Sequence, residues 1–499
     1  MELQFEKRKV SCLDFCLREV QNQEQTQEIR LPDGMPDIGR VLTSWGQVLL
    51  RSKEWREGSI AFSGGIMAWV LYAPEDGTDA RVLETWIPFQ MQWDLPSGTR
   101  EGDIRISCLP RFTDARSVSA RKILIRAGIA ALGEALAPAE LEVYEPSEME
   151  EGVHLLRDTY PVRLPREAGE KAFALDEDLT LPGSCPQPEK LLYYCLRPQI
   201  TDQKVMANKV VFRGNGNLHV LYRGEEGQLQ CWDFDLPFSQ FAELSGEYSP
   251  DAQADIRMCV TSLELELDEE GHLRLKAGLL AQFLVDDRQL LELTEDAYSP
   301  ARDVEVHTDT LRLPVLLERR TENMYGEQTI PMGANVIADA AFLPDYPRFR
   351  TTDGGLLLEI PGTFQVLFYG EDGALQSGTA RWEGQWNLPA DENARVTVQP
   401  ELMGQPRATA GDGRIDLRGD MQLKVEATGG QGIPMVTGLS LGEQREPDPM
   451  RPSLILRRVG RERLWDIAKE TGSTVDAIRL ANALEEDPEP NRMLLIPVS

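Results

Sequence analysis

Two segments of this sequence carry side chains that could act on a substrate. Asp233-Phe234-Asp235 places two carboxylates on one face of a predicted strand, as a glycosidase pair requires, although a solvent-exposed strand face has the same pattern. Gly214-Asn215-Gly216-Asn217 could form part of a phosphate-binding loop, but a strand-like segment follows it instead of a helix, which is typical of a glycine turn or bulge. We favour the exposed face and the turn or bulge.

The histidines and cysteines do not form a metal-binding or nucleophilic pattern. The four histidines (154, 219, 272 and 307) are not spaced as two ligands on one helical face. The seven cysteines (12, 16, 108, 185, 195, 231 and 259) lack both a zinc-knuckle gap and the dense even spacing of a secreted disulfide framework, which predicts reduced thiols. Walker, nucleophile-elbow and His-Glu-x-x-His motifs do not occur. We therefore expect no catalytic residue, no metal, no cofactor and no enzymatic activity; the alternative is a hydrolase hidden among β domains.

Four tryptophans could provide stacking platforms for sugars. They follow acidic turn segments, at positions 86, 93, 382 and 386. An aromatic side chain in an alternating strand is more often part of a core. We predict that these residues are core residues.

Length and charge restrict the classes of partner. With 499 residues, the chain predicts three or four domains of about 150 residues each. Its 82 acidic and 52 basic residues give a net charge of −30, which argues against binding to nucleic acid or to an anionic membrane. No apolar run is long enough to cross a bilayer, and the first residues lack a signal-peptide pattern. We expect a soluble, cytoplasmic protein without membrane insertion.

A threefold repeat organises the first 446 residues. A β-branched and aromatic run followed by an acidic pair and a glycine, which is typical of a hairpin turn, occurs three times. The glycine of this motif is Gly77, Gly227 or Gly373, so successive motifs are 150 and 146 positions apart. Segments before and after the turns keep the same phase. The pattern predicts strands throughout each copy and one hairpin at a fixed place.

The repeat also decides an ambiguous segment. Residues 123–136 are rich in Ala and Leu and would be predicted as helix from propensity alone. Arg126-Ala127-Gly128, however, aligns with Lys276-Ala277-Gly278, which lies in an alternating, strand-like segment, so we predict strand for both. Connectors are expected at Tyr144–Glu151 and Tyr298–Asp303, where proline follows tyrosine. The predicted domains are therefore 1–150, 151–300 and 301–442.

The last fifty residues have a different pattern. A polar, proline-rich linker at 443–452 precedes a domain at 453–499. A short strand at 454–459 is followed by a helix that ends at Gly472, by a second helix with Ser473 or Thr474 as its cap, and by a strand at 493–497. The fold class is therefore mainly β: three tandem β-rich domains, sandwich- or barrel-like, of about 150 residues, followed by a small βααβ domain.

The C-terminal domain resembles a LysM domain over its whole length. The matching segments are Val459-Gly460, Leu464-Trp465-Asp466-Ile467-Ala468, Thr474-Val475, Ile478, Asn482 and Leu494-Leu495-Ile496-Pro497. LysM domains bind N-acetylglucosamine polymers through the loop after the first strand and the loop before the last. Both loops differ here from the usual residues, since they read Gly460-Arg461-Glu462-Arg463 and Pro490-Asn491-Arg492. Glycan binding is therefore doubtful, and a protein ligand fits the sequence better.

The three repeats resemble the SPOCS domain of clostridial spore coat proteins. The resemblance rests mainly on Leu31-Pro32-Asp33-Gly34-Met35-Pro36-Asp37-Ile38 and Ala120-Arg121-Lys122-Ile123-Leu124-Ile125-Arg126-Ala127 in the first repeat. Three such domains followed by LysM resemble a SipL-type coat assembly protein. This resemblance implies a scaffold in the mother cell, located at the forespore surface or spore coat. It also implies that LysM binds the ATPase of the coat basement layer, stage IV sporulation protein A, with other coat proteins as further partners.

The expected partner-binding residues lie in the two LysM loops. They are Arg461, Glu462, Arg463, Trp465, Asn491 and Arg492. Arginines near the first loop could contact an acidic protein partner, or could simply be solvated. Trp465 could pack against the linker or remain partly exposed as an interface anchor. The alternative function is a cell-wall protein that binds peptidoglycan or N-acetylglucosamine polymers.

Overall fold

The computed structural model describes the whole chain except residues 1, 4, 78, 148–150, 312–315, 353–354, 389–394, 430–431, 446–449 and 499. Strands dominate the described residues, and helices occur in the C-terminal domain, so the prediction of a mainly β fold is confirmed. Among the described residues, no helix is both long enough and apolar enough to cross a membrane.

The first two repeats have the same strand order. The first comprises β2 (Phe5–Arg30), β3 (Ile38–Arg56), β4 (Ser59–Pro74), β5 (Arg81–Asp94), β6 (Asp103–Ser119) and β7 (Lys122–Pro146). The second comprises β8 (His154–Leu179), β9 (Pro188–Met206), β10 (Lys209–Gly224), β11 (Leu229–Glu243), β12 (Gln253–Leu267) and β13 (Leu273–Tyr298). In both, the first, sixth and fifth strands form one antiparallel sheet (β2-β7-β6 and β8-β13-β12), and the second, third and fourth form another (β3-β4-β5 and β9-β10-β11).

The third repeat has the same order with interrupted strands. It comprises β14 (Arg302–Leu311), β15 (Leu316–Ile330), β16 (Val336–Pro344), β17 (Arg348–Thr352), β18 (Gly355–Tyr369), β19 (Leu375–Leu388), β20 (Arg395–Leu402), β21 (Arg407–Gly411), β22 (Arg414–Thr428) and β23 (Ile433–Gln444). One sheet has the order β15-β22-β20, with β21 also paired to β22. The other centres on β18, which pairs with β16, β17 and β19. The N-terminal β1 (Glu2–Leu3) pairs with β23, which also pairs with β14. The start of the chain and the third repeat therefore share one sheet.

The three predicted hairpin turns are confirmed. They join β4 to β5, β10 to β11 and β18 to β19, which pair antiparallel. Gly77, Gly227 and Gly373 have φ values of 73°, 81° and 75°, a left-handed conformation that glycine adopts without a Cβ penalty. Each of these glycines also donates its N–H to the carbonyl three residues earlier. The local chemistry that the sequence repeats therefore produces the same turn each time.

The segment at 123–136 is a strand, as the repeat predicted. It belongs to β7, the central strand of its sheet, where pairing with β2 and β6 satisfies the backbone on both sides. The connectors, in contrast, were predicted too long. Tyr144 pairs with Lys7 inside β7, and Tyr298 pairs with His154 inside β13, so both tyrosines continue the sheets. Residues 148–150 of the first connector lie outside the described residues.

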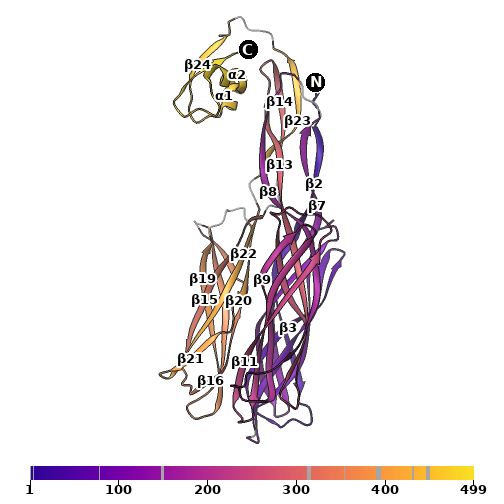
Figure 1. Cartoon of the computed structure of the whole chain (residues 1–499), viewed down its shortest axis with the longest axis vertical. Coiled ribbons are helices and arrows are strands. Elements are labelled where there is room, and N and C mark those ends of the chain that lie inside the picture. The colour runs from indigo at the N-terminus through magenta and orange to yellow at the C-terminus, as the bar shows by residue number, and fades with distance from the viewer. Residues whose placement is uncertain are drawn as a thin grey trace.

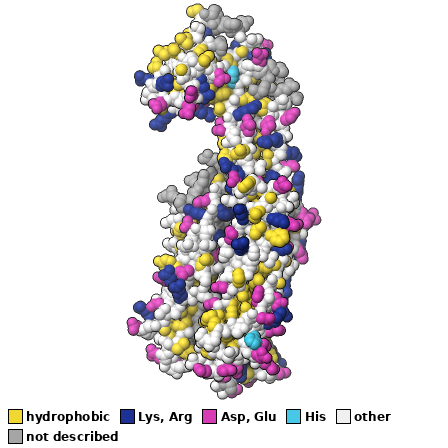
Figure 2. Space-filling view, in the orientation of Figure 1, with side chains coloured by type: hydrophobic (Ala, Val, Ile, Leu, Met, Phe, Trp, Pro, Cys, Tyr) yellow, Lys and Arg dark blue, Asp and Glu magenta, His cyan; other side chains and the backbone are white. Residues whose placement is uncertain are grey.

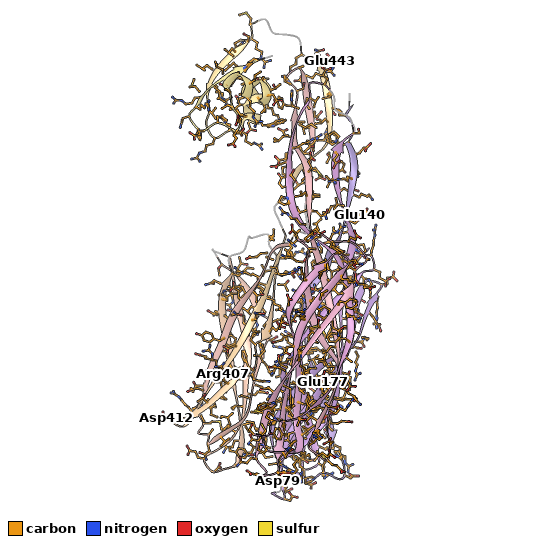
Figure 3. All side chains as sticks on the ribbon, in the orientation of Figure 1. Asp79, Glu140, Glu177, Arg407, Asp412 and Glu443 are labelled. Carbon is orange, nitrogen blue, oxygen red and sulfur yellow. The ribbon has the colours of Figure 1, made fainter. Side chains whose placement is uncertain are left out.

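The strands are arranged as a body with a narrower stalk (Figure 1). The sheets of the three repeats lie side by side in the body, and the ends of β2, β7, β8 and β13 extend upward together with β14 and β23. Figure 3 labels Glu140 on the stalk and Glu443 at its far end, whereas Glu177 lies in the body. Cys12, Val143, Leu164, Leu293 and Met435 form part of a shared apolar core in the stalk. Because each repeat contributes to this core, the stalk joins the repeats.

The repeats also meet at a buried cluster of charges. The cluster, which we call the junction network, consists of four arginines and four carboxylates that are joined by ion pairs. They are Arg18, Arg105, Arg257, Arg319, Glu134, Asp255, Asp286 and Glu426. Glu134 has no exposed side-chain surface and lies 2.5 Å from Arg18, 2.9 Å from Arg257 and 3.3 Å from Arg105. Burial raises its pKa, but the three guanidinium groups outweigh burial and lower it. Glu134 is therefore an ionised carboxylate held among three guanidinium groups.

A buried histidine joins the second repeat to the third. His219 of β10 is paired through Nδ1 with Asp233 at 2.7 Å and through Nε2 with Asp339 of β16 at 3.0 Å. Burial alone would lower the pKa of His219, but Asp339 and Asp233 outweigh burial and raise it to about 10. The imidazolium therefore donates to both carboxylates at neutral pH.

We expect this contact to weaken in alkaline solution. The pKa of His219 is about 10 in the folded chain, whereas its ordinary value is 6.5. Its contribution to stability is therefore complete below pH 6.5, declines as the pH rises, and is lost above pH 10; it is on the order of 3–5 kcal/mol. The free energy of unfolding in urea should fall more steeply over this range for the wild type than for His219→Gln, whose side chain does not titrate. Parallel pH profiles would contradict this expectation.

Candidate functional site

The C-terminal domain, which we call the head, has the predicted order of elements. It comprises β24 (Leu454–Arg458), α1 (Leu464–Thr471), α2 (Val475–Asn482) and β25 (Met493–Pro497), and β24 pairs antiparallel with β25. Gly472 ends α1 with a φ of 64°, and the Thr474 side chain accepts a hydrogen bond from the Ala477 N–H at the start of α2. Of the predicted linker, Gln444 still belongs to β23, and residues 446–449 lie outside the described residues.

The structure brings the two predicted contact loops together. The Val459 N–H donates to the Arg492 carbonyl at 2.9 Å, and the Asn491 N–H donates to the Val459 carbonyl at 2.8 Å. Asn491 has a φ of 74°, a left-handed conformation that asparagine tolerates better than most residues. Arg461, Asn491 and Arg492 are exposed, so their side chains are available to a partner.

Two other predicted contact residues are already engaged within the chain. The Glu462 carboxylate accepts hydrogen bonds from the Gly460 N–H and from Arg457, which lower the pKa of Glu462. Arg463 lies 3.4 Å from Asp466 and 3.5 Å from Glu295 of the stalk. These contacts fix the first loop, and they leave Arg461 as its projecting cation.

Trp465 is buried rather than partly exposed, and residues 446–449 of the linker lie outside the described residues. Only 7% of its surface is accessible, and its indole N–H donates to Asp296 Oδ2 at 2.9 Å. Its ring makes an edge contact with Tyr298, at 4.7 Å between centroids, and the Tyr298 hydroxyl donates to the Ser473 carbonyl at 3.0 Å. The interface that Trp465 anchors is therefore the one between the head and β13 of the stalk, which places the head at the stalk tip (Figure 1).

Asp296 is the polar centre of this interface. It accepts the indole N–H of Trp465 and two contacts of 2.8 Å from the Lys469 ammonium group. Burial raises the pKa of Asp296, but the bonds from Lys469 and Trp465 outweigh burial and lower it. A carboxylate held by two donors fixes the orientation of the head on the stalk.

We expect Asp296→Ala to loosen the head. The substitution leaves the Trp465 N–H and the Lys469 ammonium without their acceptor, which costs about 1.5–3 kcal/mol of docking free energy. Amide hydrogen exchange in α1 should become faster in the variant. Glu292→Ala is a matched control on the same strand, because the Glu292 side chain is exposed and forms a solvent-exposed ion pair with Arg157. Unchanged exchange in α1 would show that Asp296 does not hold the head.

The head has an exposed apolar surface that was not predicted from the sequence. Along β24 and β25, side chains alternate between the helices and solvent, and cross-strand partners share a face. The solvent face, which we call the outer face, consists of Leu454, Leu456, Arg458, Met493, Leu495 and Pro497. Leu456 is 63% exposed and its partner Leu495 is 40% exposed. Hydrophobic side chains gather on this side of the head in Figure 2, where Figure 1 labels β24.

Basic side chains adjoin this apolar surface. Arg458 lies on the outer face opposite Met493, and Arg492 directly precedes Met493. Both arginines are exposed. An apolar patch with a polar, charged margin is the usual composition of a protein-binding surface. The outer face and the two loops thus form a candidate binding site.

The other segments with possible chemistry have structural roles. Asp233 and Asp235 are exposed, but Asp233 binds His219, and Asp235 accepts hydrogen bonds from Asn215 and Asn217. The glycines of that segment lie inside β10, with a register shift at Gly214, so the bulge is confirmed and the turn is wrong.

Of the four tryptophans, Trp93 is fully buried in the core of the first repeat. Trp86, Trp382 and Trp386 are partly buried against the cores.

Comparison with known families found a match in one repeat. Residues 187–268 match the family model described as SipL, SPOCS domain. The match lies within the second repeat and runs from the loop before β9 to the end of β12. Neither the curated proteins nor the solved structures gave a match to the chain.

Proposed function

We propose that this chain, whose residues 187–268 match the SipL, SPOCS domain family, is a non-enzymatic adaptor of spore coat assembly. The SPOCS match supports a role in the spore. The finer proposal is that the head is a LysM domain that binds a protein, the ATPase of the coat basement layer, and so tethers the coat to the forespore surface in the mother cell.

The observation that carries this proposal is the outer face of the head. Leu456 and Leu495 lie opposite each other and expose large apolar side chains beside the arginines of the margin. Burial of such a pair against a partner removes apolar surface from water, which is the main driving force of protein association. The arginines suit a partner surface on which acidic residues surround an apolar patch.

The division between body and head supports an adaptor. The stalk holds the head away from the body of the repeats, so a partner on the head leaves the body accessible to other coat proteins (Figure 1). Two binding regions on one chain raise the effective concentration of each partner near the other. A surface layer can therefore be held by contacts that are individually weak.

The proposal is tested by binding between the purified full chain and the purified ATPase. We expect saturable binding that weakens as salt is raised, because the arginines contribute attraction that salt screens. A chain that ends at Gln444, and therefore lacks linker and head, should not bind. Equal binding by the shortened chain would assign the contact to the repeats, and binding of the full chain to N-acetylglucosamine polymers instead would favour a cell-wall protein.

A further inference from the structure

A cavity lies where the three repeats meet, in the body and apart from the head. Its volume is about 200 Å³, and each repeat contributes strands to its wall. The wall is formed by β3 and β6, by β9 and β12, and by β16 and β20, which are corresponding strands of the three repeats. Most of the wall is apolar, with Leu50, Leu109, Leu196, Val260, Leu343 and Leu402 among its residues.

The cavity wall contains an arginine that has no carboxylate partner among the described residues. Arg197 of β9 lines this cavity and a smaller adjacent one. Its Nη2 nitrogen is inaccessible to solvent and has no hydrogen-bond partner in the described part of the chain. Glu401 also lines the cavity, but its carboxylate is paired with Lys424 at 3.0 Å. A guanidinium group that lacks an acceptor, on the wall of a largely apolar cavity, is a favourable place for an anion.

Three ionisable groups in the cavity wall do not supply negative charge. Burial raises the pKa of the Tyr193 hydroxyl and of the Cys108 thiol well above their ordinary values. Burial also raises the pKa of the Cys259 thiol to about 11. All three groups are therefore neutral at neutral pH. The buried Ser107 hydroxyl, which also lines the cavity, has no hydrogen-bond partner among the described residues either.

We propose that this cavity binds a small carboxylic acid with an apolar body. The apolar wall encloses the body of the ligand, and the Arg197 guanidinium pairs with its carboxylate, the anion that fits a guanidinium in a two-point contact. A body of about six carbons suits the volume, since an engineered cavity of roughly 150 Å³ binds benzene. Because the wall comes from all three repeats, the bound acid stabilises their packing. This inference does not depend on the proposed role of the head.

The test is thermal unfolding of the full chain with hexanoate as the probe. At about 10 mM, hexanoate should raise the melting temperature of the wild type by several degrees, because it binds only the folded chain. Hexanol, which has the same body without the charge, and acetate, which has the charge without the body, should give much smaller shifts. Arg197→Met should lose the hexanoate shift, whereas Arg213→Met, at an exposed arginine on the neighbouring strand β10, should retain it.

Three results would overturn the proposal. They are the absence of a shift with hexanoate, an equal shift with hexanol, and a full hexanoate shift in Arg197→Met. If Arg197→Met does not fold, the comparison of hexanoate with hexanol on the wild type still decides. Calorimetric titration of the wild type with hexanoate is a second test of binding. We expect heat from one saturable site, and the absence of this heat would contradict the proposal.

Discussion

Replacing Glu134 by glutamine is expected to lower the free energy of unfolding by about 3–5 kcal/mol. Glu134 is fully buried and lies within 3.3 Å of Arg18, Arg105 and Arg257. Glutamine keeps the shape of the side chain but removes the charge that compensates these cations. The cost is large because the guanidinium groups remain buried and repel one another in a medium of low dielectric constant.

Urea unfolding followed by tryptophan fluorescence measures this effect without adding salt. Glu140→Gln is the matched control, because Glu140 is about half exposed and pairs with Lys9 on the stalk, at 2.6 Å. That substitution should change the stability by less than about 1 kcal/mol. If Glu134→Gln also stayed within about 1 kcal/mol of the wild type, the junction network would not hold the repeats together.

The second large effect is expected at the outer face of the head. Leu456→Asp combined with Leu495→Asp should weaken binding to the basement-layer ATPase at least about 100-fold. Each leucine contributes apolar surface to the proposed contact, and each aspartate brings a charge that must be desolvated. Because both leucines point to solvent, the fold of the head should be retained.

The control for this variant is Leu290→Asp. Leu290 is also on a strand and is 62% exposed, but it belongs to β13 of the stalk. Its replacement should leave the affinity unchanged. Binding curves of the outer-face variant and of the wild type that coincide, with circular dichroism showing both chains folded, would remove the outer face from the account.

Local chemistry explains what could be predicted from the sequence. The hairpin glycines need only their neighbours to define a turn, and they recur in phase, so Gly77, Gly227 and Gly373 were placed correctly. The repeat was needed for residues 123–136, because Ala and Leu favour helix locally while sheet pairing on both sides decides in favour of strand. The two helices of the head carried their own caps and were predicted for that reason.

Contacts between distant segments could not be predicted in the same way. Glu134 is paired with Arg18 and Arg257, more than a hundred positions away in each direction, and each looks like an ordinary polar residue in its own strand. Trp465 was correctly predicted on a helix near the contact loops, but its acceptor, Asp296, belongs to β13 of the second repeat, more than 160 positions away. The burial of Trp465 therefore depends on how the head is docked, which a local pattern does not encode.

The outer face did have a signal in the sequence. Leu454-Ile455-Leu456 and Leu494-Leu495-Ile496 are apolar at consecutive positions, so both faces of a two-stranded sheet must carry apolar residues. The head has helices for only one of those faces, and Ile496 and Leu494 occupy that side. Because the sheet has two apolar faces and the helices cover one of them, Leu456 and Leu495 could have been predicted as exposed.

The most direct test of the adaptor account is the position of the chain in sporulating cells. Fluorescent fusions of the full chain and of a chain that ends at Gln444 would be compared in the same strain. We expect a ring around the forespore for the full chain and a diffuse mother-cell signal for the shortened one. A ring that survives the loss of the head, or a full-length signal at the outer wall or septum, would contradict it.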